Sequence, residues 1–182
     1  MEVVLAELDE FINRSVMAHA LAIMGLRQIP SQLQRIPAFA ENPDPDFFVG
    51  IGDPNVEMRP YGRLKRSEVL GQVVLGGPVD ILLGQQWVVY VFTAWEHGFR
   101  PRLAAAHGCE ASELTYPLFG DLRLLRNDVV HHHGIATAEW TGRCEVLRWF
   151  QAGEELRIKG EHLEEFVRRF PWAEMQNGPR LP

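Results

Sequence analysis

The sequence contains little cysteine, almost no lysine and no long run of apolar residues. Its two cysteines, Cys109 and Cys144, form no CxxC motif and are too few for a disulfide framework, so we expect two reduced, largely packed thiols. The longest apolar runs are far shorter than the roughly 20 residues that span a bilayer. The first residues, MEVVLAELDE, are acidic where a signal peptide is basic. We therefore expect a soluble cytoplasmic protein without membrane contact.

Several common enzyme signatures are also missing. The chain has no P-loop, GxSxG, HExxH or dinucleotide-binding glycine motif, and no internal repeat. Its formal net charge of −6 argues against a broadly basic surface that coats nucleic acid, although a local cationic cleft remains compatible with that charge. Only Lys65 and Lys159 among the 18 basic residues are lysines, and we attribute this bias to genome composition.

The apolar residues that are present recur mostly at helical spacing. This pattern predicts a mainly α-helical, single-domain protein over residues 1–182, folded as an antiparallel bundle of about four to six helices. Gly25 is expected to end the first helix, Ser67 to cap a short one, and Pro101 to turn the chain after the most apolar one. The expected helices are 2–24, 67–75, 79–99, a segment between Thr115 and Gly134, 143–151 and 161–170.

The remaining parts of the chain are expected to be irregular. Residues 25–62 contain six prolines and form a predicted insertion, in which FFVGI (47–51) is a candidate strand. This insertion is expected to pack back on the core, because Phe39, Phe47 and Phe48 are too apolar for a free linker. A short extended piece is expected at 156–158, and residues 171–182 form a predicted flexible tail.

One predicted helix carries an unusual polar cluster at its C-terminal end. Its apolar stripe consists of Leu118, Leu122, Leu125 and Val129, and its last turns read RNDVVHHH over 126–133. Asn127 and His131 lie four residues apart and share a face, and Asp128 aligns with both His131 and His132. Arg126 lies about 140° from His131 on an ideal helix. An Arg–His pair that converges on one phosphate therefore needs a long reach, or a second copy of the helix in a symmetric dimer.

These residue types suit phosphodiester cleavage in RNA. The reaction needs a base for the 2′-hydroxyl, an acid for the leaving 5′-oxygen and a cation for the charged phosphorane. Imidazoles near neutral pH serve the first two roles, and a guanidinium serves the third. The carbonyls at a helix C-terminus favour imidazolium, and no metal or other cofactor is required.

The arrangement Arg126-Asn127-x3-His131, late in a helix of an all-α protein, resembles the Arg-x4–6-His signature of the HEPN superfamily. Glu96-x3-Arg100 resembles a further acidic–basic pair that members often carry on a preceding helix. The resemblance implies a helical homodimer whose two motifs face each other and form a metal-independent RNase site. It covers mainly residues 79–133, and residues 25–62 have no counterpart in it.

On this reading Arg126, Asn127 and His131 are the catalytic candidates, with RNA as substrate. His131 would act as general base or acid, Arg126 as the phosphate-binding cation, and Asn127 as a group that orients His131 or contacts phosphate. The supporting or substrate-binding candidates are Glu96, Arg100, Asp128, His132 and His133. HEPN ribonucleases of toxin or phage-defence systems would add an antitoxin or regulatory protein as a partner.

Other interpretations stay open at this point. The 126–133 cluster could be a structural polar interface with no chemistry, Glu96 and Arg100 could form only an ion pair, and His132 and His133 could simply face solvent. A metal site could join Asp128 and His132 to His97, His107 or Glu96, although three adjacent histidines cannot bind one ion. A non-catalytic helical dimer that binds a partner protein or nucleotide is the second function class.

Overall fold

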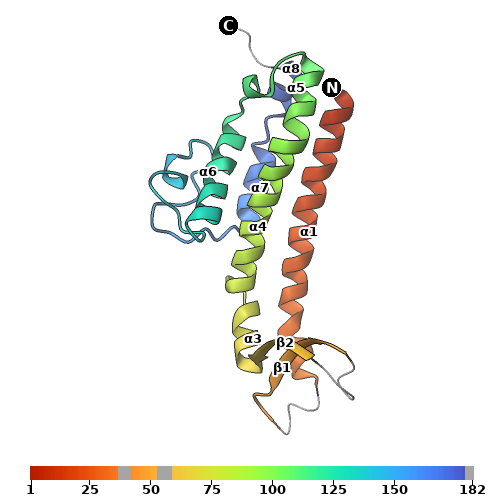
Figure 1. The fold of residues 1–182 in the computed structure, drawn as a ribbon, viewed down its shortest axis with the longest axis vertical. Coiled ribbons are helices and arrows are strands. Elements are labelled where there is room, and N and C mark those ends of the chain that lie inside the picture. Colours follow the sequence, from red (N-terminus) through yellow and green to blue (C-terminus); the bar gives the residue numbers. More distant parts are fainter. Residues whose placement is uncertain (37–41, 53–58, 179–182) are drawn as a thin grey trace. The chain divides into compact units, whose positions relative to one another are not determined.

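The computed structural model of the protein describes residues 1–36, 42–52 and 59–178, and residues 37–41, 53–58 and 179–182 lie outside the described part. The protein is mainly α-helical, as predicted (Figure 1). The described elements are α1 (Glu2–Gln34), β1 (Asp46–Ile51), β2 (Arg59–Lys65), α3 (Arg66–Val73), α4 (Pro78–Ala94), η1 (Trp95–Phe99), α5 (Arg100–His107), η2 (Ala111–Glu113), α6 (Pro117–His131), η3 (Thr141–Arg143), α7 (Gly160–Arg168) and α8 (Trp172–Asn177).

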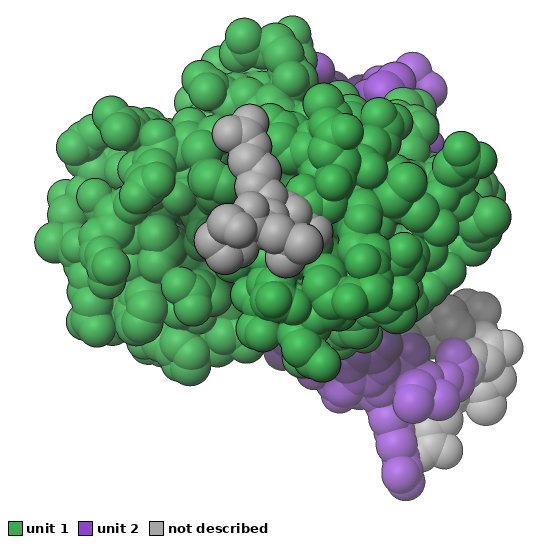
Figure 2. Space-filling model, turned by 90° about the horizontal axis from the view of Figure 1, so that it is seen from above, with its two compact units in different colours: residues 1–20, 81–182 green, residues 21–80 purple. Residues whose placement is uncertain are grey.

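Two compact units divide the chain. Unit 1 comprises residues 1–20 and 81–182, and unit 2 comprises residues 21–80 (Figure 2). The predicted insertion at 25–62 falls within unit 2. The assignment of residues 1–182 to one domain stays a prediction.

Unit 1 is an antiparallel helical bundle around one hydrophobic core. The Trp87 indole N–H on α4 donates to the Ser15 hydroxyl on α1, 3.2 Å away, and the rings of Phe11 and Phe99 lie 5.3 Å apart. The earlier residue of α1, Phe11, contacts the later residue, Phe99, so α1 and α4 run antiparallel (Figure 1). Trp87 also packs edge-on against Phe166 of α7, and Trp95 stacks on Phe119 of α6 at 4.0 Å. The core thus consists of interlocked aromatic side chains from four helices.

The apolar helix does not end at Pro101, contrary to the prediction. It passes through the π-helical turn η1, in which the Arg100 amide donates to the Trp95 carbonyl, and continues as α5 with Pro101 in its first turn. A proline has no N–H and its ring clashes with the carbonyl four residues earlier in a regular α-helix. The wider turn directly before Pro101 provides the room, so the helix changes its pitch and does not break.

The first helix is longer than the predicted range 2–24. Gly25 does not end it, and α1 continues to Gln34 with Pro30 inside. A glycine costs a helix only about 1 kcal/mol, and Leu26, Arg27 and Gln28 after it are good helix formers. The prediction was wrong because it treated a weak breaker as a stop signal.

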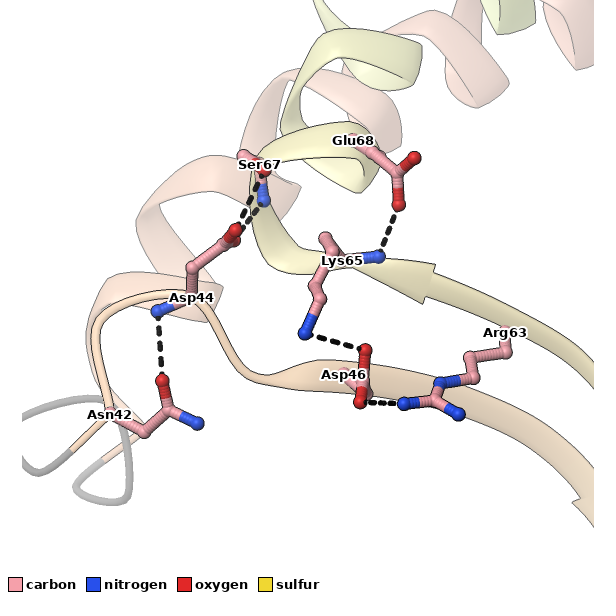
Figure 3. A network of polar contacts seen from close by, with 7 residues as sticks. All are labelled: Asn42, Asp44, Asp46, Arg63, Lys65, Ser67 and Glu68. Carbon is pink, nitrogen blue, oxygen red and sulfur yellow. Dashed lines mark hydrogen bonds and ion pairs between the residues drawn. The ribbon is translucent and has the colours of Figure 1, made fainter.

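In unit 2 the candidate strand at 47–51 is confirmed as part of β1, which pairs antiparallel with β2. A β-bulge interrupts the pairing at Val49 and Gly50. Ser67 was expected to cap the short helix α3, but α3 begins at Arg66 and its N-cap is Lys65. Asp44 accepts hydrogen bonds from the amide and the hydroxyl of Ser67 (Figure 3). Phe39, which was expected to pack on the core, lies outside the described residues.

The segment that follows α6 is mostly non-helical. The predicted helix at 143–151 is wrong, because only Thr141–Arg143 form a short 3-10 turn and the residues after it form no helix. The expected extended piece at 156–158 contains no assigned strand, and the preceding residue, Glu155, forms a single β-bridge with Ile135. The tail also differs from the prediction, because it contains α8, whose Met175 is fully buried.

Among the described residues, no single helix is long and apolar enough to cross a membrane. One bent pair, 66–73 with 78–107, meets the criterion by length and composition only.

Candidate functional site

The polar cluster predicted at 126–133 lies at the C-terminal end of α6. Pro117 occupies the first turn, as expected, but Tyr116 is the N-cap and Thr115 lies outside the helix. The apolar stripe faces the core, and Leu122 and Leu125 are completely buried. On the opposite side, Gly120, Arg123 and His131 are exposed, and Asn127 is partly exposed. One face of α6 is therefore open over most of its length.

Two of the three catalytic candidates contact each other directly. Arg126 donates from Nη1 to the Oδ1 atom of Asn127 at 3.1 Å, and both side chains are partly buried. His131 lies one helical turn after Asn127 and is exposed. The amide of Asn127 thus orients the guanidinium of Arg126, whereas His131 faces solvent.

The end of α6 has an unusual backbone. His132 is its C-cap, and His133 and Gly134 both have positive φ, 54° and 75°. The Gly134 amide donates to the Asp128 carbonyl, so Gly134 closes the helix as predicted. The φ of 75° at Gly134 is a conformation that residues with a Cβ atom rarely adopt, so glycine is favoured there. This turn presents His132 and His133 to solvent beside His131.

Asp128 departs from its predicted position beside His131. It is 0% exposed, and its carboxylate accepts hydrogen bonds from the amide and hydroxyl of Thr137 and from the amide of Thr141. Burial raises the pKa of Asp128, but the hydrogen bonds from Thr141 and Thr137 outweigh burial and leave the pKa below its ordinary value. Asp128 therefore holds the loop after α6 and does not face a substrate.

Asp121, seven residues before Asp128 on α6, also holds a later segment of the chain through hydrogen bonds. It was not among the predicted site residues. It is 3% exposed and accepts hydrogen bonds from the amides of Glu145, Val146 and Leu147, at 3.0, 2.6 and 2.6 Å. Three successive amides bound to one carboxylate hold the segment 145–147 against α6. A signal was available, since Asp121 and Asp128 lie seven residues apart on the apolar side of α6.

Glu96 and Arg100 form the expected ion pair, 2.9 Å between Oε2 and Nη1. Arg100 also donates from Nε to the Leu114 carbonyl at 3.1 Å. The pair lines a cavity of about 230 Å³ whose wall includes Arg123, a residue that the sequence analysis did not propose. Arg126, Asn127 and His131 do not line this cavity. His131 lies eight residues beyond Arg123, roughly 12 Å along the helix axis, so one protomer does not bring the two groups together.

In the described part of the chain, no three His, Cys, Asp or Glu side chains lie close enough together to hold a metal ion. The alternative of a metal site therefore has no ligand cluster there. Asp128 is engaged by the loop, and Nε2 of His107 lies 2.9 Å from the Met175 carbonyl. Two of the proposed metal ligands therefore have other structural partners.

Comparisons with known proteins provide no further assignment. No family model, no curated protein and no solved structure matches this chain. The function of the protein is therefore inferred from the chemistry of the described residues.

Proposed function

We propose that this protein is a metal-independent endoribonuclease of HEPN type, active as a cytoplasmic homodimer in a toxin or phage-defence context. One observation carries the proposal. Arg126 is held by Asn127 on the flank of α6, and His131 stands exposed one turn further on the same helix. This combination provides an oriented, permanently charged group and an exposed imidazole at the same end of one helix.

The reaction divides between these groups. One imidazole removes the proton from a 2′-hydroxyl, whose oxygen attacks the neighbouring phosphorus. The bond from phosphorus to the 5′-oxygen breaks, and a second imidazole gives its proton to that oxygen. The products are a 2′,3′-cyclic phosphate and a free 5′-hydroxyl. Arg126 stabilises the charge that develops on the phosphorane, and the carbonyls at the end of α6 favour the protonated imidazole.

A second copy of the chain supplies the second imidazole. In one protomer the two sides of α6 separate Arg126 from His131, whereas a two-fold axis beside the helix end brings both pairs to one cleft. Val130 and Ile135 flank His131 and are 46% and 40% exposed. These apolar side chains favour a contact between copies at this end of α6.

The first test is cleavage of varied single-stranded RNAs in the presence of EDTA. His131→Ala is expected to lower the rate by a factor of about 10² to 10⁴, because general acid–base catalysis contributes that much. Arg126→Ala is expected to lose comparable activity, and Arg126→Lys to recover only part of it, because lysine lacks the planar fork.

Arg168→Ala serves as the control, since Arg168 is exposed on α7 and belongs to neither part of the motif. This variant is expected to cleave RNA like the wild type. A verified wild-type dimer that cuts none of the RNAs would refute the proposal and favour a non-catalytic dimer that binds a partner protein or nucleotide.

A further inference from the structure

The β1–β2 hairpin of unit 2 combines exposed cations with exposed aromatic rings. The stretch RPYGRLKR (59–66) contains four basic residues and no acidic one, in a chain whose net charge is −6. Nearly every residue of β2 is exposed. The exposed fractions of Tyr61 and Phe48 are 72% and 47%, and those of the Arg63 and Lys65 side chains are 63% and 49%.

The pairing register explains how these groups meet. Phe48 is the cross-strand partner of Arg63, and Asp46 is the partner of Lys65, so the four side chains share one face. The Arg63 guanidinium lies 5.5 Å from the centroid of the Phe48 ring. The bulge beside Val49 and Gly50 interrupts the alternation, so Tyr61 and Arg59 project from a more strongly twisted part of the hairpin.

Among the described residues of the hairpin, three cations, Arg59, Arg63 and Lys65, accompany one carboxylate, that of Asp46. Arg63 and Lys65 share this carboxylate, with 3.0 Å between Lys65 Nζ and Asp46 Oδ1 (Figure 3). No ion pair of Arg59 occurs within the described ranges. The two acids of the connecting segment, Asp53 and Glu57, lie outside the described residues. The strand β2 therefore presents cations that phosphates can contact.

We infer that this hairpin is a binding surface for single-stranded RNA, formed by the set Phe48, Arg59, Tyr61, Arg63 and Lys65, here called the ribbon cluster. Arg63 and Lys65 are two residues apart on β2, roughly 7 Å along the strand, a spacing that suits successive phosphates of an extended chain. Exposed aromatic rings provide surfaces on which unpaired bases stack. Base pairing hides those faces in a duplex, so the aromatic rings favour a single strand.

Protection of a sheet edge is the simplest competing explanation, because lysine and arginine discourage pairing with other strands. Edge protection accounts for the charges but not for Tyr61 and Phe48, which would be liabilities on an unpartnered hairpin. The inference depends on the charge and aromatic pattern of unit 2. It adds a substrate-binding surface to the proposed function, and it is tested independently of catalysis on α6.

The test is fluorescence anisotropy with the full-length protein and a 2′-O-methyl oligouridine of about 15 nucleotides, which cannot be cleaved through its 2′-oxygen. The triple variant Arg59→Gln, Arg63→Gln, Lys65→Gln is expected to bind at least about tenfold more weakly at low salt. Its slope of log affinity against log salt is expected to fall by about two, because each phosphate contact to a single strand contributes about 0.7. The matched control Arg14→Gln, Arg102→Gln, Arg168→Gln makes the same change in net charge within unit 1 and is expected to stay within about twofold of the wild type.

A second pair of variants tests base stacking. Tyr61→Ala is expected to weaken binding by about fivefold or more, Tyr61→Trp to restore it, and Tyr90→Ala, at a 58% exposed ring in unit 1, to change nothing. Equal affinities of the two triple variants, or of Tyr61→Ala and Tyr90→Ala, would overturn the inference. So would equally tight binding of an RNA duplex, or binding of phosphatidylserine vesicles in place of RNA.

The two proposals separate in the same assay. His131→Ala is expected to lose cleavage and keep its affinity for the oligonucleotide. The ribbon-cluster triple variant is expected to keep its catalytic groups and lose affinity. Circular dichroism of each variant confirms that the helical content is unchanged.

Discussion

Two buried carboxylates organise the non-helical part of unit 1. Asp121 and Asp128 together accept six hydrogen bonds from the segment 137–147, five of them from backbone amides. A buried charge is costly unless it is fully hydrogen-bonded, and here the amides satisfy both groups. The path of the chain after α6 is therefore determined by side chains of α6.

Replacement of either carboxylate by its amide tests this arrangement. In Asp128→Asn or Asp121→Asn, an NH2 group would face backbone N–H donors, so we expect a loss of about 2–4 kcal/mol in the free energy of unfolding. Urea denaturation followed by circular dichroism measures the change. Glu139→Gln, at an exposed residue of the same loop, is the control and should change the value by less than about 0.5 kcal/mol.

Acid should act through the same group. Because the pKa of Asp128 is lower in the folded protein than its ordinary value of 3.8, its contribution to stability is present above that value and is lost as the pH falls through the folded pKa. Wild-type stability should therefore decline between about pH 5 and pH 2. The Asp128→Asn variant should show a shallower decline in denaturation midpoints over this range, and an unchanged slope would contradict the assignment.

The two thiols should differ in reactivity. Burial raises the pKa of Cys144 to about 12, and the side chain is 7% exposed, whereas Cys109 is partly exposed. Only the thiolate reacts with alkylating agents. Iodoacetamide at about pH 8 should modify Cys109 first and Cys144 only after unfolding, as mass spectrometry of peptides can establish. Equal rates in the native protein would show that Cys144 is more accessible than its burial indicates.

The site residues were only partly predictable from the sequence. Helical spacing correctly placed Asn127 and His131 on one face, because both belong to a regular helix. It could not show that Asp128 faces inward, because burial depends on segments far along the chain. Arg123 became a candidate only when the fold brought α6 beside Glu96 and Arg100.

At the scale of elements, α4 and the segment at Ile158 approach each other very closely. A Cβ atom added at Gly84 would lie 2.7 Å from the Ile158 carbonyl oxygen and 2.8 Å from its Cβ. The close approach at Gly84 thus involves the non-helical segment that contains Ile158 and not a neighbouring helix. Glycine is needed in this helix because backbone lies against backbone.

Gly84→Ala should therefore destabilise the protein by about 1–3 kcal/mol through overpacking, although alanine favours helix. Gly120→Ala on α6 is the matched control, since no atom lies within 4 Å of its added Cβ. That variant should gain up to about 1 kcal/mol from helix propensity. Thermal unfolding of both variants measures the contrast, and stabilisation by both would show that Ile158 moves away easily.

Elements with strong apolar periodicity were predicted well, and elements that depend on tertiary contacts were not. The stripe on α6 and the run of apolar residues in α4 identify their helices without further information. The predicted helix at 143–151 is absent, and this segment is held instead by tertiary hydrogen bonds from its amides to Asp121. The hairpin was recognised only at 47–51, because its second strand, with Pro60 and Gly62, lacks apolar alternation.

At the scale of the whole molecule, the proposed active site is shared between two copies of the chain. Val130→Arg should therefore convert a dimer into monomers and remove RNA cleavage, while Arg126, Asn127 and His131 remain in place. Sedimentation equilibrium and the cleavage assay report the two effects. A fully active monomeric variant would contradict the shared site.

Mixed dimers offer an independent check. Wild-type protomers mixed with an excess of the double variant Arg126→Ala, His131→Ala and allowed to exchange subunits should lose most of their activity, because a mixed site contains only one of the two imidazoles that the reaction needs. Mixing with an excess of Arg168→Ala protomers, which keep the motif, provides the matched control and should leave the rate high. A rate with the double variant equal to that of the wild-type protomers alone would show that each site is confined to one chain.

The π turn at 95–99 has a consequence for the ancestry of this chain. It holds one more residue than a regular turn between two helices that otherwise continue each other. Loss of a single codon there would turn the wide turn into a regular one and leave a single uninterrupted α-helix, with the residues after it in nearly the same orientation. Chains of common descent are therefore expected to differ by single-residue gaps at this turn, while the helices on either side keep their lengths.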